Sequence, residues 1–365
     1  MITRSISGLV VATGTGAPMR SARPKPIHLL CGRAMASYVL DTLASVGIRQ
    51  GVVVTGVEGG RVSKRLLEDP PGFPLRFVEQ KLDRGTGDAV LIGLSGFDDF
   101  NDEEDLLIVP ADLPLLRPDV LEQLLTTHAG SGAACTVLAV REEMPGFGRV
   151  IRNRHGAVSA VVAEADLDPL LHDLDGQPEY ASGVYCVRRG LLAPAIRRTR
   201  PENAAGELLL SDVVEVIADS GHSCAAVVVD TVDDLVPVDD RLQLAWAEAE
   251  LRRRTNRHWL AMGVTMVDPE RTYIDATVSL GTDVTIFPGT ILQGSTTIGD
   301  GCELGPDVRL DRCQVGLGVR IEKATARLAV IGDDCTVGPF AVLHPGSELP
   351  AHTTTGPFYA GTHTE

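Results

Sequence analysis

Two sites along the chain carry residues that could take part in binding or catalysis. The first is a glycine turn, Thr-Gly-Thr-Gly at residues 13–16, which follows a predicted strand over residues 6–12. A glycine turn at the end of a strand brings backbone N–H groups close to a phosphate. The second is Asp112, which follows a predicted strand at residues 106–110. Ligands gather at the carboxyl ends of strands in a parallel sheet, so both segments are candidates for a binding site.

The charge balance limits which ligands the chain can meet. Its 49 acidic and 33 basic side chains give a formal net charge of −16. Nucleic acid and anionic membrane surfaces attract basic faces, so neither is an expected partner. A phosphate ligand therefore requires positive charge concentrated in one place, and the loop over residues 20–25 supplies it with Arg20, Arg23 and Lys25.

Strands and helices that would position these segments alternate along the chain. Apolar patterning predicts strands at residues 6–12, 51–55, 75–78, 106–110 and 134–140, and helices at residues 34–46 and 118–128. Such alternation is typical of a mostly parallel sheet with helices on both faces. We therefore predict a Rossmann-like α/β domain in the first part of the chain.

A different periodicity begins after residue 270. An aliphatic residue falls at every sixth position from Ile274 to Leu310, slips to Val315 and Ile321, and resumes its spacing from Ile331 to Leu349. A period of six fits neither a helix nor a plain strand, and is typical of a left-handed parallel β-helix of hexapeptide repeats. A chance run of aliphatic residues in an all-β domain is the alternative. Because such a coil does not bury its flanks alone, we expect a homotrimer.

A predicted helix at residues 238–254 separates the two patterns. Asp239 or Asp240 can cap its start, and arginines at residues 252–254 suit its carboxyl end. The expected organisation is therefore a globular domain at residues 1–238, a linker helix at 239–258, a β-helix at 259–350 and a loose tail at 351–365.

Cysteine usage and hydropathy indicate the compartment. The seven cysteines are scattered and form no C-x-x-C pair, which is typical of reduced, buried thiols. No apolar run approaches the roughly 18 residues that a membrane span needs, and the early residues lack a signal-peptide pattern. We expect a cytoplasmic protein.

Both halves together resemble one family, the bacterial bifunctional N-acetylglucosamine-1-phosphate uridylyltransferase/glucosamine-1-phosphate acetyltransferases. The family segments L-A-A-G-x-G-T-R-M and P-K-x-L-H correspond to residues 11–19 and 24–28. Its segments Q-x-x-x-x-G-T-G-x-A, Y-G-D-x-P-L, G-Y-G-R and V-N-N-R-L-Q-L follow in the same order at residues 80–89, 110–115, 146–149 and 238–244. The resemblance implies an α/β nucleotidyltransferase domain followed by a short left-handed β-helix.

The resemblance also implies the chemistry. It predicts a sugar-1-phosphate nucleotidyltransferase that joins UTP, or a related triphosphate, to N-acetylglucosamine 1-phosphate or a related sugar phosphate and releases pyrophosphate. Asp112 and Asp239 match the metal-ligand positions for Mg²⁺, and Lys25 matches a substrate-phosphate contact; these three form the implied catalytic set. The implied substrate contacts are Val11, Ala12, Thr13, Gly14, Gln80, Gly85, Thr86, Gly148 and Glu164.

Each of the three implied catalytic residues also has a structural alternative. Asp112 could be a turn aspartate, since Asp-x-Pro is rich in turns. Asp239 stands where the family has asparagine, and could serve only as a helix cap. Lys25 could be a solvated surface lysine.

Several positions depart from the family pattern. Pro18 replaces the arginine that clamps the triphosphate, and losing a charge aimed at the transition state typically costs about 10²–10³ in rate. Arg20 or Arg23 is a candidate replacement. Ala163 stands where the family has glutamate, with Glu164 one place late, and Ala181 stands where it has asparagine. Alanine cannot hydrogen-bond a sugar, so these positions favour a different acceptor or none.

The acetyltransferase half departs further. The repeat pattern ends near Leu349, before the segment that carries the family's general-base histidine, and His344 replaces the arginine of L-R-P-G. We therefore expect no acetyl transfer.

Three hypotheses remain from the sequence. The leading one is a nucleotidyltransferase, which Asp112, Lys25 and the segment Gly85-Thr86 favour. The second is a catalytically impaired subunit that binds nucleotide sugars or regulates a partner, which Pro18 and the two alanines favour. The third is a structural trimer scaffold. Release of pyrophosphate, nucleotide binding without turnover, and no binding at all distinguish the three.

Overall fold

The computed structural model describes residues 4–97, 101–144, 146–163, 166–167, 177–204 and 206–361. Internal contacts divide the chain into two compact units. The first unit comprises Met1–His28 and Ala34–Gln243, and the second comprises Leu29–Arg33 and Leu244–Glu365. The two-strand segment β2 (Leu29–Leu30) and β3 (Arg33–Ala34) lies where the chain passes between the units.

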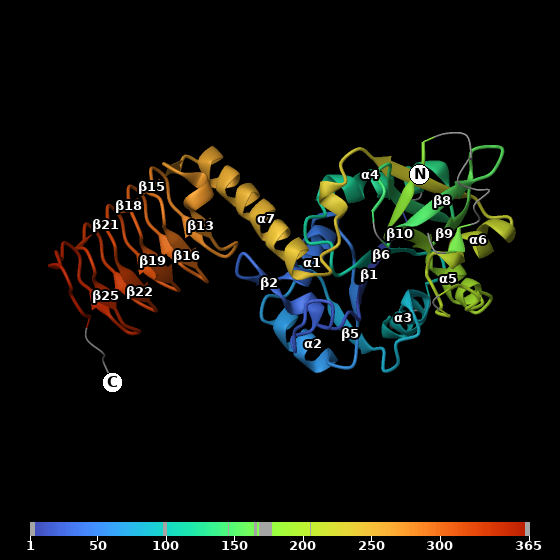
Figure 1. The fold of residues 1–365 in the computed structure, drawn as a ribbon, viewed down its shortest axis with the longest axis horizontal. Coiled ribbons are helices and arrows are strands. Elements are labelled where there is room, and N and C mark those ends of the chain that lie inside the picture. The colour runs from blue at the N-terminus through green and yellow to red at the C-terminus, as the bar shows by residue number, and fades with distance from the viewer. Residues whose placement is uncertain are drawn as a thin grey trace. The chain divides into compact units, whose positions relative to one another are not determined.

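The first unit is built on one large sheet (Figure 1). Its main strands lie in the order β11-β7-β10-β6-β1-β4-β5. Their bounds are β1 Ile6–Ala12, β4 Gly51–Thr55, β5 Leu75–Glu79, β6 Asp105–Pro110, β7 Cys135–Val140, β10 Tyr180–Arg188 and β11 Cys224–Val229. The strands pair in parallel, except that β10 runs antiparallel to both β6 and β7. A hairpin of β8 (Gly148–Arg152) and β9 (Val158–Val162) joins the edge of β10.

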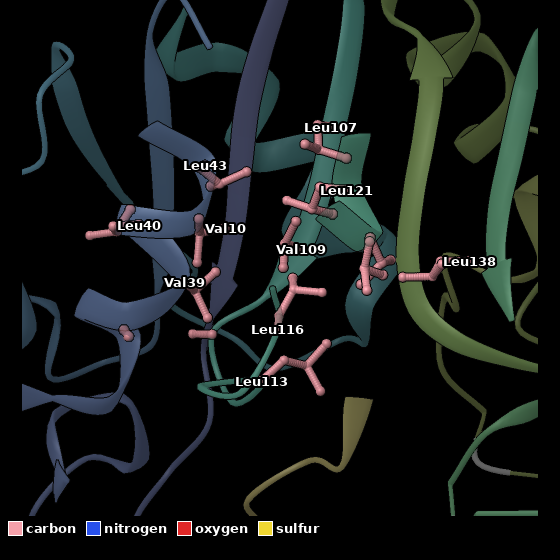
Figure 2. Packing of buried hydrophobic residues seen from close by; sticks show 14 of the residues in the cluster. Val10, Val39, Leu40, Leu43, Leu107, Val109, Leu113, Leu116, Leu121 and Leu138 are labelled. Carbon is pink, nitrogen blue, oxygen red and sulfur yellow. The ribbon is translucent and has the colours of Figure 1, made fainter. Parts of the chain in front are cut away.

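Helices pack on both faces of this sheet because successive side chains on its strands alternate. Val10, Leu107 and Val109 lie in one buried cluster, together with residues from three helices, α1, α2 and α4; Figure 2 labels members from α1 and α4. Leu9, Leu106 and Ile108 lie in the other cluster, with residues from three further helices, α3, α5 and α6. The helix bounds are α1 Met35–Ser45, α2 Gly59–Leu67, α3 Thr86–Gly93, α4 Pro118–Ser131, α5 Arg189–Ile196 and α6 Asp212–Asp219.

The mostly parallel α/β fold predicted from the sequence is confirmed. The strands expected at residues 6–12 and 51–55 have the predicted bounds, and the others differ by one residue at one end. The antiparallel strand β10 and the hairpin beside it were not predicted. Glycine, alanine and arginine interrupt the apolar residues of these strands, which weakens their sequence signal. The antiparallel pairing also depends on strands far away in the sequence, which periodicity along the chain does not reveal.

The second unit is a left-handed parallel β-helix made of three sheets of short strands. The sheet orders are β12-β15-β18-β21-β24, β13-β16-β19-β22-β25 and β14-β17-β20-β23-β26, and all their pairs are parallel. The strands are β12 Thr265–Met266, β13 Tyr273–Ile274, β14 Ser279–Leu280, β15 Thr285–Ile286, β16 Ile291–Gln293, β17 Thr297–Ile298, β18 Glu303–Leu304, β19 Arg309–Asp311, β20 Gln314–Val315, β21 Arg320–Ile321, β22 Thr325–Arg327, β23 Val330–Ile331, β24 Thr336–Val337, β25 Val342–Leu343 and β26 Glu348–Leu349.

The six-residue period reflects inward-facing side chains. The spaced aliphatic residues of the pattern are buried in one cluster, apart from Leu280, which is half-buried against it. The slip after Leu310 reflects shorter steps along the coil, because Val315 follows Leu310 after five residues instead of six. Ala326 occupies the inward position between Ile321 and Ile331, five residues from each, so the coil continues there with a small side chain.

Two expectations at the ends of the β-helix need correction. The linker helix, α7, spans Arg241–Ala261 instead of 238–254, so Arg253 and Arg254 lie inside it and pair with Glu250. Residues 351–361 differ from the loose tail expected there. Thr354 and Ala360 form parallel bridges to Thr336 and Val342, which continues the stacking.

Two further observations concern hydropathy and thiols. In the described ranges no helix is long and apolar enough to cross a membrane. All seven cysteines are free and buried.

We expect substitution of an inward coil residue to destabilise the β-helix far more than substitution of its outward neighbour. Ile298 is 4% exposed, whereas the adjacent Thr297 faces solvent. Ile298→Ala should lower the free energy of unfolding of the coil by about 2–5 kcal/mol, because it leaves a cavity between turns. Thr297→Ala should change it by less than about 0.5 kcal/mol. Denaturant titration followed by far-UV circular dichroism measures both, and equal effects would contradict the inward assignment.

Candidate active site

A cavity of about 420 Å³ lies at the carboxyl ends of β1 and β6. Val11 and Ala12 line it from the end of β1, and Thr13 and Gly14 line it from the turn that follows. The segment from Pro110 to Leu113 lines it from the end of β6. The sheet therefore brings the glycine turn and Asp112 to one site, as their positions after neighbouring parallel strands predicted.

A second cavity of about 330 Å³ shares Ala12, Thr13 and Gly14 with the first. Its other lining residues come from the rest of the loop and from two neighbouring segments, namely Thr15, Gly16, Ala17, Ser21, Ala22, Pro24, Gly56, Val57, Glu58, Val62, Gln80 and Asp83. The glycine turn is thus a wall common to two cavities, so a ligand in each would meet at the turn.

Lys25 lies between two carboxylates at the floor of the first cavity. It begins the 3-10 helix η1 (Lys25–Ile27), and its backbone N–H donates to the Gly14 carbonyl across 3.3 Å. Its Nζ donates to Asp112 Oδ2 and to Asp239 Oδ1, each at 2.5 Å. The Lys25 side chain is only 11% exposed, so this is a buried ion pair and not a solvated surface lysine.

The electrostatics keep this ammonium charged. Burial lowers the pKa of Lys25, but the adjacent carboxylates of Asp112 and Asp239 raise it by more, so the net shift is upward. Lys25 therefore carries a permanent positive charge in a chain whose net charge is strongly negative.

Asp239 and Asp240 lie side by side before α7 but have different contacts. Asp240 Oδ1 accepts the backbone N–H groups of Leu242 and Gln243, at 2.8 and 2.9 Å. Gln243 Oε1 in turn accepts the N–H groups of Asp239 and Asp240. This reciprocal arrangement is a capping box, with Asp240 as the capping residue. The carboxylate of Asp239 is left to contact Lys25.

The donor set at this point suits a hard divalent cation. Across the described ranges, no three His, Cys, Asp or Glu side chains converge as a closed metal cage. Asp112 and Asp239 form a pair of carboxylates that reach a common point, occupied by the Lys25 ammonium. Mg²⁺ is usually held by one or two carboxylates and completes its shell with water and substrate phosphates. The residues present therefore fit Mg²⁺.

The segment from Gln80 to Thr86 is tied to the segment around Leu209. Gly85 has φ +100°, and a Cβ there would lie 2.5 Å from the Leu208 carbonyl oxygen, so only glycine fits. Thr86 lines the first cavity and its Oγ1 accepts the N–H of Leu210 at 3.0 Å. Gln80 lines the second cavity, whereas Gly85 lines neither cavity.

The positions implied for sugar recognition fall in two groups. Gly148, at the start of β8, lines the first cavity, and so do Ala163 and Ala181. Glu164 lies outside the residues that the structure describes. Gly148, Ala163 and Ala181 offer no side-chain hydrogen bond to a sugar.

Part of the wall was missed from the sequence. It comprises Ile108, Pro110, Ser182, Tyr185, Leu209, Leu210, Ser211 and Pro237. Tyr185 comes from the unpredicted strand β10, and burial raises the pKa of its hydroxyl, which keeps it protonated. The apolar run Leu208–Leu210, just before α6, is the sequence signal that could have located part of this wall.

The candidate replacements for the missing arginine lie on the outer side of the loop. Arg20 and Arg23 are both exposed, as is Pro18. Backbone hydrogen bonds from Arg20 to Ala17 and from Ser21 to Gly16 close this loop tightly. Neither arginine forms a salt bridge within the described residues, so both guanidinium groups are available to an anion.

Comparison with known proteins agrees with this architecture. Residues 8–213 match the MobA-like NTP transferase domain family. The chain is 38% identical to the bifunctional protein GlmU of Trichlorobacter lovleyi over 354 residues, which is 96% of this chain and 75% of that protein. It is 37% identical to the bifunctional protein GlmU of Streptomyces avermitilis over 357 residues, covering 97% of this chain and 73% of that protein. This chain therefore belongs to the GlmU family, and its first unit is a MobA-like nucleotidyltransferase domain.

Proposed function

We propose that this protein is a sugar-1-phosphate nucleotidyltransferase that uses UTP or a related triphosphate. The acceptor is N-acetylglucosamine 1-phosphate or a related sugar phosphate, and the products are a nucleotide sugar and pyrophosphate. The observation that carries the proposal is the ion cluster of Lys25, Asp112 and Asp239 beside a glycine turn shared by two cavities. Two cavities that meet at the glycine turn, the first of them lined by the ion cluster, suit a reaction between two phosphate-bearing substrates.

The reaction requires the two phosphates to approach in line. An oxygen of the sugar phosphate attacks the α-phosphorus of the triphosphate, a new P–O bond forms, and the bond to the β-phosphate oxygen breaks as pyrophosphate leaves. In this proposal the triphosphate places its base in the second cavity, and the sugar phosphate occupies the first. Lys25 and the N–H groups of the glycine turn hold negative phosphate oxygens and stabilise charge at the reacting phosphate.

Asp112 and Asp239 would hold Mg²⁺, which supplies Lewis-acid stabilisation of the phosphoryl oxygens when bound. The capping of α7 by Asp240 keeps the Asp239 carboxylate directed at Lys25. The Lys25 ammonium already pairs with both carboxylates, so Asp112 and Asp239 are held in position before any substrate arrives.

A second candidate function is a binding subunit with impaired turnover. Pro18 takes the place of the motif arginine, and Ala163 and Ala181 line the first cavity without hydrogen-bonding side chains. These residues favour either an acceptor with fewer recognised hydroxyl groups or binding of a nucleotide sugar without catalysis. A panel of nucleoside triphosphates and sugar 1-phosphates, assayed for pyrophosphate release and for binding, separates the two functions.

We propose further that the protein works as a cytoplasmic homotrimer without acetyl transfer. The seven free, buried thiols favour a reducing compartment. Val330 and Val342, each 42% exposed on the coil faces, favour self-association. His344 in place of the arginine of L-R-P-G argues against acetyl transfer. Light scattering of the purified chain and an assay with acetyl-CoA test these two points.

Asp112→Asn should reduce turnover by about 10²–10³-fold, because it removes a carboxylate from both the ion cluster and the proposed metal site. Asp240→Asn is the matched control. Asparagine caps a helix as well as aspartate does, so the control should keep its activity. Pyrophosphate release at saturating substrates measures both variants. Equal activity of Asp112→Asn and the wild-type protein would contradict the catalytic assignment.

We also expect Arg20 and Arg23 to replace the missing motif arginine. The double substitution Arg20→Ala/Arg23→Ala should lower kcat by about 10²–10³-fold, the usual effect of losing charge that stabilises the transition state. Arg197→Ala/Arg198→Ala is a control with the same loss of charge on exposed residues that line neither cavity. Unchanged turnover in the first double variant of an active preparation would show that neither arginine serves this role.

A further inference from the structure

Gln80 is a buried amide whose orientation is determined by its neighbours. It is 2% exposed and lines the second cavity. Its backbone N–H donates to the Thr55 carbonyl at 2.8 Å, which fixes the chain at the end of β5. Its side-chain Nε2 donates to Asp88 Oδ2 at 2.8 Å and to the Gly85 carbonyl oxygen at 3.3 Å. Both of these partners are acceptors.

Only one of the two amide orientations is compatible with these partners. An ionised carboxylate and a backbone carbonyl accept hydrogen bonds and donate none. Turning the Gln80 amide over would place Oε1 against two oxygens and leave buried polar atoms unsatisfied. The NH₂ group is therefore held on the side of Asp88, and Oε1 is the polar atom that Gln80 can offer to a ligand in the cavity.

Asp88 is well placed to impose this orientation. It lies in the first turn of α3, where the helix dipole favours a negative charge. The 2.8 Å contact is charge-assisted and is the shorter of the two that hold the Gln80 amide. Asp88 lines neither cavity, so it would act on a ligand only through Gln80.

We infer that Asp88 is a positioning residue for base selection: it holds Gln80 as a hydrogen-bond acceptor, so that the second cavity takes a base presenting a ring N–H. This rests on the proposed function, because it assumes that the second cavity receives the base of the triphosphate. Uracil and guanine present such an N–H. Cytosine and adenine carry an unprotonated ring nitrogen at the corresponding place. That nitrogen and Gln80 Oε1 are both acceptors, so no hydrogen bond forms between them.

The test compares Asp88→Leu with Asp88→Glu. Leucine removes the acceptor and frees the Gln80 amide to turn over, whereas glutamate keeps a carboxylate that accepts from Nε2 and donates nothing. Asp88→Leu should raise KM for UTP about 10-fold, leave kcat within about 2-fold, and reduce the preference for UTP over CTP about 10-fold, the effect of one mismatched hydrogen bond. Asp88→Glu should stay within about 3-fold of the wild-type protein on all three measures.

A double-mutant cycle separates positioning from a general loss of structure. In a Gln80→Leu background, Asp88→Leu should have no further effect on the UTP/CTP preference, because its only route to the base is gone. Circular dichroism checks that each variant is folded. An unchanged preference in folded Asp88→Leu, or a fall in kcat at constant KM, overturns the inference.

Calorimetric binding of UTP and CTP distinguishes this inference from the proposed function. If the wild-type protein binds UTP but releases no pyrophosphate, the proposed catalytic function fails, and the ratio of dissociation constants still tests Asp88. If it turns over substrate and the ratio does not respond to Asp88→Leu, only the inference fails. A wild-type protein that binds neither nucleotide overturns the inference as well.

Discussion

The site depends on a single ammonium group held between two carboxylates. Lys25 is buried, and an unpaired buried ammonium would lose several kcal/mol of solvation. Asp112 and Asp239 offset that loss, and Lys25 in turn balances one of their two negative charges. Removing Lys25 leaves two neighbouring carboxylates without their cation, which is costly, whereas removing one aspartate leaves the ammonium paired with the other. The cluster therefore stabilises the folded site as well as supplying its charged groups.

Three separate parts of the chain must be in place for this cluster to form. The parallel pairing of β1 with β6 places Asp112 beside the glycine turn, because Val11 is opposite Pro110. The hydrogen bond from Lys25 to Gly14 folds the loop back over the turn. The capping box of Asp240 and Gln243 sets the direction in which Asp239 leaves the helix. Two of these constraints join backbone groups, and the capping box joins the side chains of Asp240 and Gln243 to backbone N–H groups.

Local periodicity was sufficient to predict most of the fold. The strands of the parallel sheet are short apolar runs bounded by turns, and the β-helix repeats its inward residues at a fixed spacing, so both signals lie within a few residues. The antiparallel β10 was not predictable in this way, because its pairing with β6 and β7 joins residues far apart in the chain. The slip in the coil was visible as a break, but the role of Ala326 was not, since alanine carries no periodic signal of its own.

The site was predictable to a similar degree. The glycine turn, Lys25, Asp112 and Asp239 could be named because they sit at strand ends or in recognisable segments. The sequence does not decide whether Asp239 or Asp240 caps the helix, because an aspartate at either position is a suitable cap. The wall residues Tyr185 and Leu210 were missed, because a cavity lining depends on which elements pack together. The same holds for Asp88, whose contact with Gln80 follows from the way α3 begins.

The cysteines of the coil give the β-helix a built-in reporter. Cys302, Cys313 and Cys335 are fully buried, and their Sγ atoms donate to backbone carbonyls. Cys302 and Cys313 lie in the turn built from β18, β19 and β20, whereas Cys335 precedes β24, two turns further along the coil. In a stacked solenoid each turn contacts only its neighbours, so a turn can detach from an end without global unfolding. A thiol-reactive dye would reach each sulfur only after its own turn had opened. The order in which the three thiols are labelled would therefore record the direction in which the coil frays.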